Sequence, residues 1–66
     1  MKLSNFEKMD PNLLVGLVNT ALRNDYDDLR DLAKSQDIEA SALEERLAQI
    51  GYVYVPEQNQ FRPGPK

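Results

Sequence analysis

The side chains that could do chemistry in this sequence are mainly carboxylates, because histidine and cysteine are both absent. Without histidine the chain lacks the commonest general base, and without cysteine it lacks disulfides and thiolate metal sites. Glu44 and Glu45 are the most obvious pair of acids. As neighbours on a helix they point about 100° apart, which does not suit a shared acid/base pair. A solvated helix face explains them better, and we expect no catalytic residue and no enzyme.

A second group of acids, Asp25, Asp27 and Asp28, invites comparison with a calcium-binding loop. The EF-hand loop needs acidic ligands at alternating positions, then a glycine and a distant glutamate. Leu29 and Arg30 stand where this pattern requires ligands or the glycine. Helix capping is the better interpretation, with Asp27 as the expected cap. The sequence therefore predicts no metal site and no cofactor.

Asn19 and Arg23 form the most interesting polar pair, since they lie one turn apart on the polar side of an expected helix. They could form a small recognition patch. The interpretation we favour is structural, with Arg23 paired to Asp27 or Asp28 and Asn19 bonded to a loop carbonyl. The residues kept as candidates for an interaction site are Asn19, Arg23, Glu44, Glu45 and Gln49.

Two short helices joined by a tight turn are predicted within residues 29–51. Ala33, Ile38 and Leu43 follow one another at five-residue intervals, and Leu47 lies one helical turn further on. This spacing is typical of a helix-turn-helix, in which a small residue lets the second helix cross closely. The residues expected to be buried here are Leu29, Leu32, Ala33, Ile38, Leu43, Leu47 and Ile50.

The ends of these two helices follow from capping residues. The first helix should span residues 28–35, and Asp37 should adopt the left-handed conformation in the turn. The second should begin after a cap at Glu39 or, in competition with it, Ser41. Gly51 should end it, because glycine adopts the left-handed conformation without strain.

An earlier and longer helix is predicted over Pro11–Asn24, with Asp10 as its cap. Its apolar residues cover an arc of about 200°, with Leu13 and Val15 at opposite edges. An arc this wide indicates a central helix that is covered on more than one side, or one that partly faces a partner.

The N-terminal arm, residues 1–9, carries Leu3, Phe6 and Met9 at three-residue spacing. These side chains could fold over one edge of the apolar arc, or that edge could meet a second copy of the chain. We favour the monomer over the homodimer, because small monomers expose few large apolar patches.

The residue pattern changes after Gly51. Tyr52, Val53, Tyr54 and Val55 favour a strand, the next four residues favour a turn, and residues 60–62 can return as a second strand. The predicted fold is mainly α, a three-helix, helix-turn-helix-like bundle with a short C-terminal β-hairpin in the position of a winged-helix wing. Residues 1–9 form an arm, residues 10–62 a single domain, and residues 63–66 a disordered tail.

Several short motifs together suggest a family. The chain resembles the small bacterial proteins grouped as domain of unknown function 4250 over residues 6–62. Asn24 departs from the acid expected after Leu22-Arg23. The resemblance implies one compact bacterial domain and brings no activity, cofactor or catalytic residue. The motifs that carry it are Asp10-Pro11-Asn12, Val18-Asn19, Leu22-Arg23, Asp37-Ile38, Gly51-Tyr52-Val53-Tyr54, Pro56-Glu57 and Asn59-Gln60-Phe61.

The net charge and the length of the chain limit the classes of function that it can have. The 66-residue chain has a net charge of −3 and its eight basic residues are dispersed, whereas nucleic-acid modules concentrate lysine and arginine. No apolar run approaches the ~20 residues that span a bilayer, and the N-terminus does not read as a signal peptide, so we expect a cytoplasmic protein without membrane contact. We predict a protein-interaction or regulatory module without catalysis, bound to an unknown protein partner. A DNA-associated helix-turn-helix regulator is the alternative, disfavoured by charge.

Overall fold

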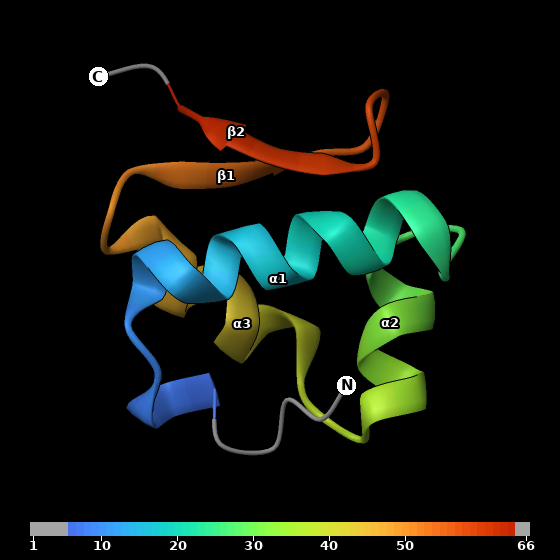
Figure 1. The fold of residues 1–66 in the computed structure, drawn as a ribbon, viewed down its shortest axis with the longest axis horizontal. Coiled ribbons are helices and arrows are strands. Elements are labelled where there is room, and N and C mark those ends of the chain that lie inside the picture. The colour runs from blue at the N-terminus through green and yellow to red at the C-terminus, as the bar shows by residue number, and fades with distance from the viewer. Residues whose placement is uncertain (1–5, 65–66) are drawn as a thin grey trace.

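The computed structural model describes residues 6–64 and confirms the predicted fold class, three helices followed by an antiparallel hairpin (Figure 1). Within these residues no helix is both long and apolar enough to cross a membrane. In chain order the elements are the 3₁₀ helix η1 (Phe6–Lys8), α1 (Pro11–Asn24), α2 (Leu29–Gln36), α3 (Ala40–Ala48), β1 (Tyr52–Val55) and β2 (Gln60–Pro63).

Helix α1 is the central element. Asp10 caps it as predicted, because its side chain accepts a hydrogen bond from the Asn12 N–H at 3.0 Å, and Pro11 occupies the first helical position. The hairpin lies on one side of α1 and α2 on the other (Figure 1). This placement explains the wide apolar arc, since α1 buries Leu14, Val15, Val18, Ala21 and Leu22.

Helix α2 begins one residue later than predicted, and its cap is Asp28 rather than Asp27. The Asp28 carboxylate accepts from the Asp31 N–H at 2.8 Å, while the Asp27 N–H donates to the Asp31 carboxylate at 3.2 Å. The other end also lies one residue later than predicted, at Gln36, but Asp37 is left-handed as expected, with φ 59°. The Ile38 N–H then donates to a carbonyl of the last turn and closes the helix.

Helix α3 ends at Ala48 rather than at the predicted Gly51. Its last turn tightens, because the Ile50 and Gly51 N–H groups bond carbonyls three residues back, at 3.2 and 2.9 Å. Gly51 is left-handed as predicted, with φ 82°, and it turns the chain into β1. At the start of α3, Glu39 occupies the cap position without a side-chain cap hydrogen bond, and Ser41 lies inside the helix.

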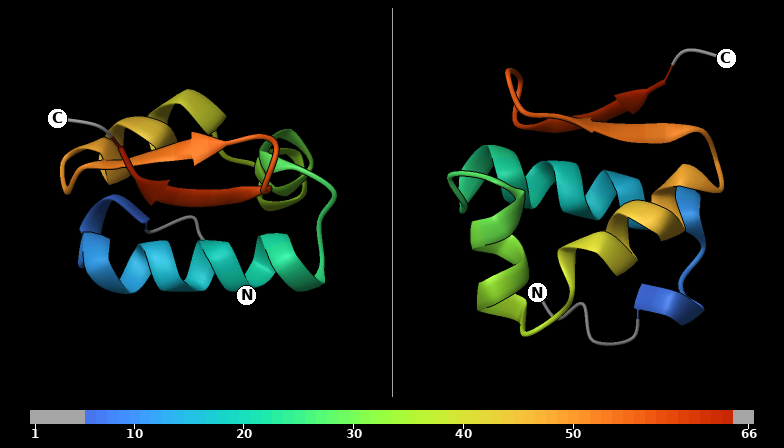
Figure 2. Two further views of the ribbon diagram at one scale, coloured as in Figure 1. Left: turned by 90° about the horizontal axis from the view of Figure 1, so that it is seen from above. Right: turned by 180° about the vertical axis from the view of Figure 1, so that it is seen from behind.

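The hairpin packs on two helices. Seen from above, β2 lies next to α1 and β1 next to α3 (Figure 2). The rings of Tyr54 and Phe61 lie opposite each other in the register, with centroids 5.5 Å apart, and both pack against the helical core. Strand β2 extends one residue beyond the prediction, to Pro63, and the Gly64 N–H donates to the Gly51 carbonyl at 2.7 Å. The last two residues of the predicted tail lie outside the described part of the chain.

One core joins all of these elements. Of the seven residues expected to be buried around the turn, five are buried, while Ile38 and Ile50 are half-buried and pack on the core. Phe6 is 5% exposed and belongs to the same core cluster as the buried residues of α1, and Met9 packs against this cluster. Leu3 lies outside the described residues. The opposite edge stays open, since Leu13 is 58% exposed.

We expect Leu47→Ala to lower the free energy of unfolding by about 2–5 kcal/mol, because Leu47 is fully buried and its truncation leaves a cavity. Leu13→Ala is the matched control on the exposed edge of α1, and its cost should stay within about 0.5 kcal/mol. Urea unfolding of the two variants beside the unmodified chain measures both. Similar costs at the two positions would show that the packing of α3 is misassigned.

Candidate interaction site

Asn19 binds the backbone of β2 through both ends of its side-chain amide. Its Nδ2 donates to the Phe61 carbonyl at 3.0 Å, and the Phe61 N–H donates to its Oδ1 at 2.7 Å. Gln60 adds a third link, because its Nε2 donates to the Asn19 carbonyl at 2.9 Å. The partner is a strand residue rather than the loop carbonyl we predicted. Asn19 is half-buried, and both polar atoms of its amide help to hold the hairpin on α1.

Arg23 lies one turn further along α1 and is exposed. The predicted ion pair with Asp27 or Asp28 is wrong, since within residues 6–64 Arg23 makes no ion pair with either. The start of α2 uses both residues, Asp28 as the cap and Asp27 through its N–H bond to Asp31. Asn19 and Arg23 therefore do not act together as one polar patch.

A second polar cluster ties the hairpin turn to the corner between α1 and α2. The Tyr54 hydroxyl accepts from the Leu29 N–H at 3.2 Å and donates to the Asn59 Oδ1 at 2.7 Å. The Asn59 Nδ2 donates to the carbonyls of Leu22 and Tyr26, at 3.0 and 3.2 Å. One turn residue thus satisfies backbone groups at the end of α1. From the sequence, Asn59 was predicted only to be a turn residue. The feature that could have singled it out is the tolerance of asparagine for left-handed backbone, seen here as φ 52°.

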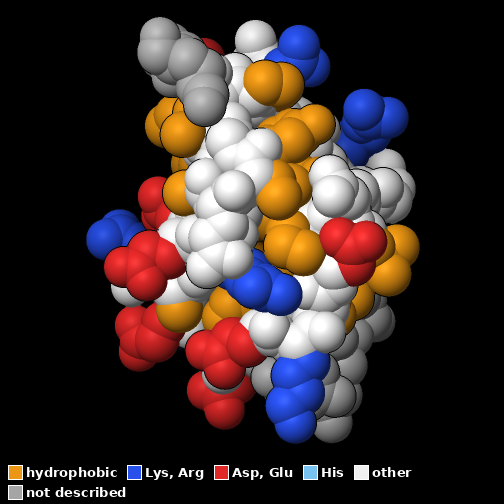
Figure 3. All heavy atoms as spheres, turned by 90° about the vertical axis from the view of Figure 1, so that its left-hand side faces the viewer, with side chains coloured by type: hydrophobic (Ala, Val, Ile, Leu, Met, Phe, Trp, Pro, Cys, Tyr) orange, Lys and Arg blue, Asp and Glu red, His pale blue; other side chains and the backbone are white. Residues whose placement is uncertain are grey.

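Glu44 and Glu45 line a shallow groove of about 270 Å³ between α3 and β1. Its apolar side includes Val53, which is 44% exposed, and the half-buried Tyr52. The end of the molecule where α3 runs into β1 shows exposed hydrophobic side chains beside groups of acidic ones (Figure 3). The full lining is Glu44, Glu45, Ala48, Tyr52, Val53 and Tyr54. Sequence reasoning chose the two glutamates but missed Val53, because its proximity to them depends on where the hairpin packs.

Gln49, the fifth candidate, lies outside this groove, in a neighbouring hollow beside Arg46. Its side-chain oxygen accepts from the Arg46 Nη1 at 3.0 Å, and the Arg46 Nη2 donates to the Met9 carbonyl at 2.7 Å. Arg46 therefore joins the N-terminal segment to α3, and its guanidinium is turned toward the protein. Among the described residues, Arg46 makes no ion pair with Glu44 or Glu45, the two carboxylates of the groove.

Asp28 and Asp31, the acids at the start of α2, accept backbone hydrogen bonds at this helix end. Within residues 6–64 no cluster of three or more acidic side chains is arranged to hold an ion. The groove offers different chemistry: aliphatic and aromatic carbon next to two exposed carboxylates. Such a surface suits a ligand that presents apolar groups together with positive charge.

The three helices with their packed antiparallel hairpin define a small, mainly helical domain. The chain belongs to the family described as "Domain of unknown function (DUF4250)", whose model matches residues 8–61. The resemblance noted from the sequence motifs is thereby confirmed. Neither the curated proteins nor the solved structures contain a match to this chain.

We expect Asn19→Ala to lower the free energy of unfolding by about 1–3 kcal/mol. The substitution removes the partner of the Phe61 N–H and carbonyl, and both hydrogen bonds are partly buried. Asn24→Ala is the matched control, an exposed asparagine at the end of the same helix. It should change stability by no more than about 0.5 kcal/mol. Equal effects in urea unfolding would show that the Asn19–Phe61 contact contributes nothing beyond helix propensity.

Proposed function

We propose that this chain is a protein-interaction module that acts without catalysis and binds its partner in the groove between α3 and β1. The observation that carries the proposal is the position of exposed Val53 beside Glu44 and Glu45. Exposed apolar surface bordered by charged groups is common at protein-binding sites. A regulatory role would follow from such binding.

The partner that fits this groove differs from the chain itself. Two copies joined through the groove would bring four glutamates together, two from each chain, and each chain has a net charge of −3. Like charges brought together at an interface cost binding energy. This supports a monomer that binds another protein, with the homodimer as the less favoured arrangement.

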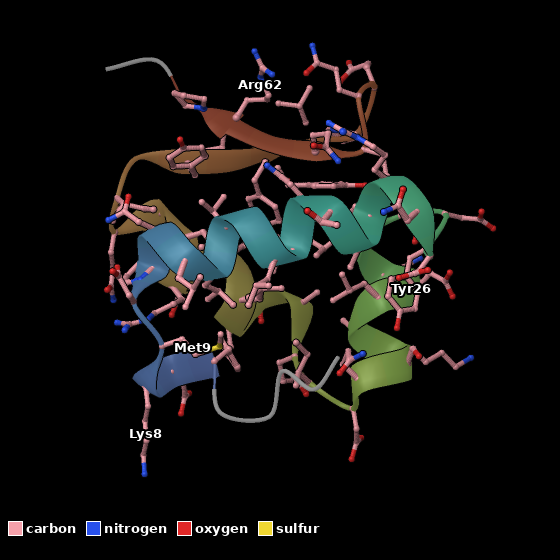
Figure 4. All side chains as sticks on the ribbon, in the orientation of Figure 1. Lys8, Met9, Tyr26 and Arg62 are labelled. Carbon is pink, nitrogen blue, oxygen red and sulfur yellow. The ribbon has the colours of Figure 1, made fainter. Side chains whose placement is uncertain are left out.

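The alternative function, DNA association, has weaker support. Arg46 is the one basic residue of α3, and its guanidinium bonds Met9 and Gln49 rather than facing outward. The outer face of α3 instead carries two glutamates. Arg62 extends from the outer side of the hairpin, away from the helices (Figure 4). Together, α3 and the hairpin therefore present one outward-facing arginine, whereas DNA affinity depends on several phosphate contacts made by one surface.

We therefore expect no sequence-specific binding to duplex DNA at physiological salt. Fluorescence anisotropy with a pool of random duplexes, followed by selection, measures this. Sub-micromolar binding that weakens steeply as salt rises would overturn the expectation, because that dependence reports phosphate contacts.

The interaction itself is tested by site-specific photo-crosslinking in the native host. A benzoylphenylalanine at Val53 should capture a protein partner, and the same group at Leu13 should not. Leu13 is the matched control, because these two are the exposed large hydrophobic residues of the described chain. Glu44→Lys should reduce the capture from position 53. Capture from Leu13 alone, or equally from both positions, would place the interaction elsewhere and contradict the proposal.

A further inference from the structure

The two edges of the hairpin differ in the backbone groups they leave free. The N–H and carbonyl of Phe61 both point to Asn19, away from β1. In an antiparallel pair, the residue directly opposite then turns its own N–H and carbonyl to the other side. That residue is Tyr54. The Gly64–Gly51 hydrogen bond continues the same alternation, so Tyr52 also turns its backbone groups outward.

The outer edge of β2 is closed to further pairing. Asn19 occupies both backbone groups of Phe61, and Pro63, the next outward-facing residue, has no N–H. The outer edge of β1 is open. Among residues 6–64 no group bonds the outward N–H and carbonyl groups of Tyr52 and Tyr54. One edge of this small sheet is thus blocked, and the other presents four unpaired backbone groups.

The groove between α3 and β1 contains residues of this open edge. Its lining includes Tyr52, Val53 and Tyr54 from the strand and Glu44, Glu45 and Ala48 from the helix. A strand added to β1 would lie about 4.8 Å from it, over the groove. Because side chains alternate along a strand, every second one would face the two glutamates, and the others would lie beside the exposed Val53.

We propose that an extended segment of a partner protein, with lysine or arginine at alternate positions, adds to β1 as a third strand. This inference rests on the proposed function and specifies the chemistry of the partner and its binding mode. Backbone hydrogen bonds to Tyr52 and Tyr54 hold the segment, and alternate side chains select it. Glu44 and Glu45 set the preference for positive charge. They also disfavour a second copy of this chain, which would bring the same acids to the edge.

The test uses a short peptide of alternating lysine and valine, added to the full chain and followed by NMR. Binding should shift the amide signals of Tyr52 and Tyr54 and slow their hydrogen exchange. A peptide with glutamate in place of lysine should not bind. Two further peptides, one N-methylated at the valine amides and one at the lysine amides, show which edge of the bound strand donates hydrogen bonds to β1. One of these two peptides should lose binding and the other should keep it, because only every second N–H faces β1.

Two charge reversals test the role of α3. Glu45→Lys should weaken binding of the lysine peptide by about tenfold. Glu57→Lys, in the exposed hairpin turn outside the groove, makes the same change in net charge and should leave the affinity within about twofold. Equal losses for the two variants would overturn the assigned role of the groove, because they would reflect overall charge alone.

Three other outcomes would overturn the inference. Shifts confined to other residues at about 1 mM peptide would mean that the open edge does not bind such a strand. If the peptide binds but hydrogen exchange at the Tyr52 and Tyr54 amides does not slow, the peptide contacts the chain in another way than by strand addition. The proposed function would still hold in that case, provided that Val53 captures a protein partner. Capture of a second copy through Val53 would assign the edge to self-association. The proposed function itself fails if crosslinking at Val53 captures no protein partner in the host, and this result is independent of the peptide experiment.

Discussion

The paired hydrogen bonds between the Asn19 side chain and the Phe61 backbone are the contact on which the placement of the hairpin depends. A two-stranded hairpin is marginal alone in water, and a 66-residue chain has room for only a small core. The hairpin therefore needs anchors on the helices. Asn19 fixes it to the middle of α1, while Asn59 fixes its turn to the corner between α1 and α2. With the hairpin held, the Phe61 ring, 1% exposed, completes the core.

The same contact gives the hairpin its asymmetry. By occupying the outer edge of β2, Asn19 leaves the outer edge of β1 as the place where a strand can pair. Open strand edges promote unwanted association, and proteins commonly protect them with charge. The carboxylates of Glu44 and Glu45 line the groove at this open edge, where a second copy of the chain would bring the same negative charge. In the binding mode proposed above, protection against self-association and selection of a basic partner would be two effects of one pair of residues.

Local features were predictable from the sequence, and long-range ones were not. The Asp10 cap and the left-handed Asp37 depend on residues within a few positions of each other, and both were expected. The cap of α2 was misassigned because Asp27 and Asp28 are chemically equal neighbours, and only the backbone conformation distinguishes them. The partner of Asn19 lies 42 residues away, so no local spacing reveals it. The groove was equally hidden, since it forms only where β1 packs on α3.

Residue-by-residue amide hydrogen exchange in the unbound chain tests this account most directly. The N–H of Phe61 should exchange slowly although it lies on the outer side of β2, because Asn19 accepts its hydrogen bond. The N–H of Val53, paired across the hairpin with Arg62, should also be slow. The Tyr52 and Tyr54 N–H groups in the same strand should exchange much faster, since they face outward. Fast exchange at Phe61, or protection at Tyr52 and Tyr54 equal to that of Val53, would contradict the account.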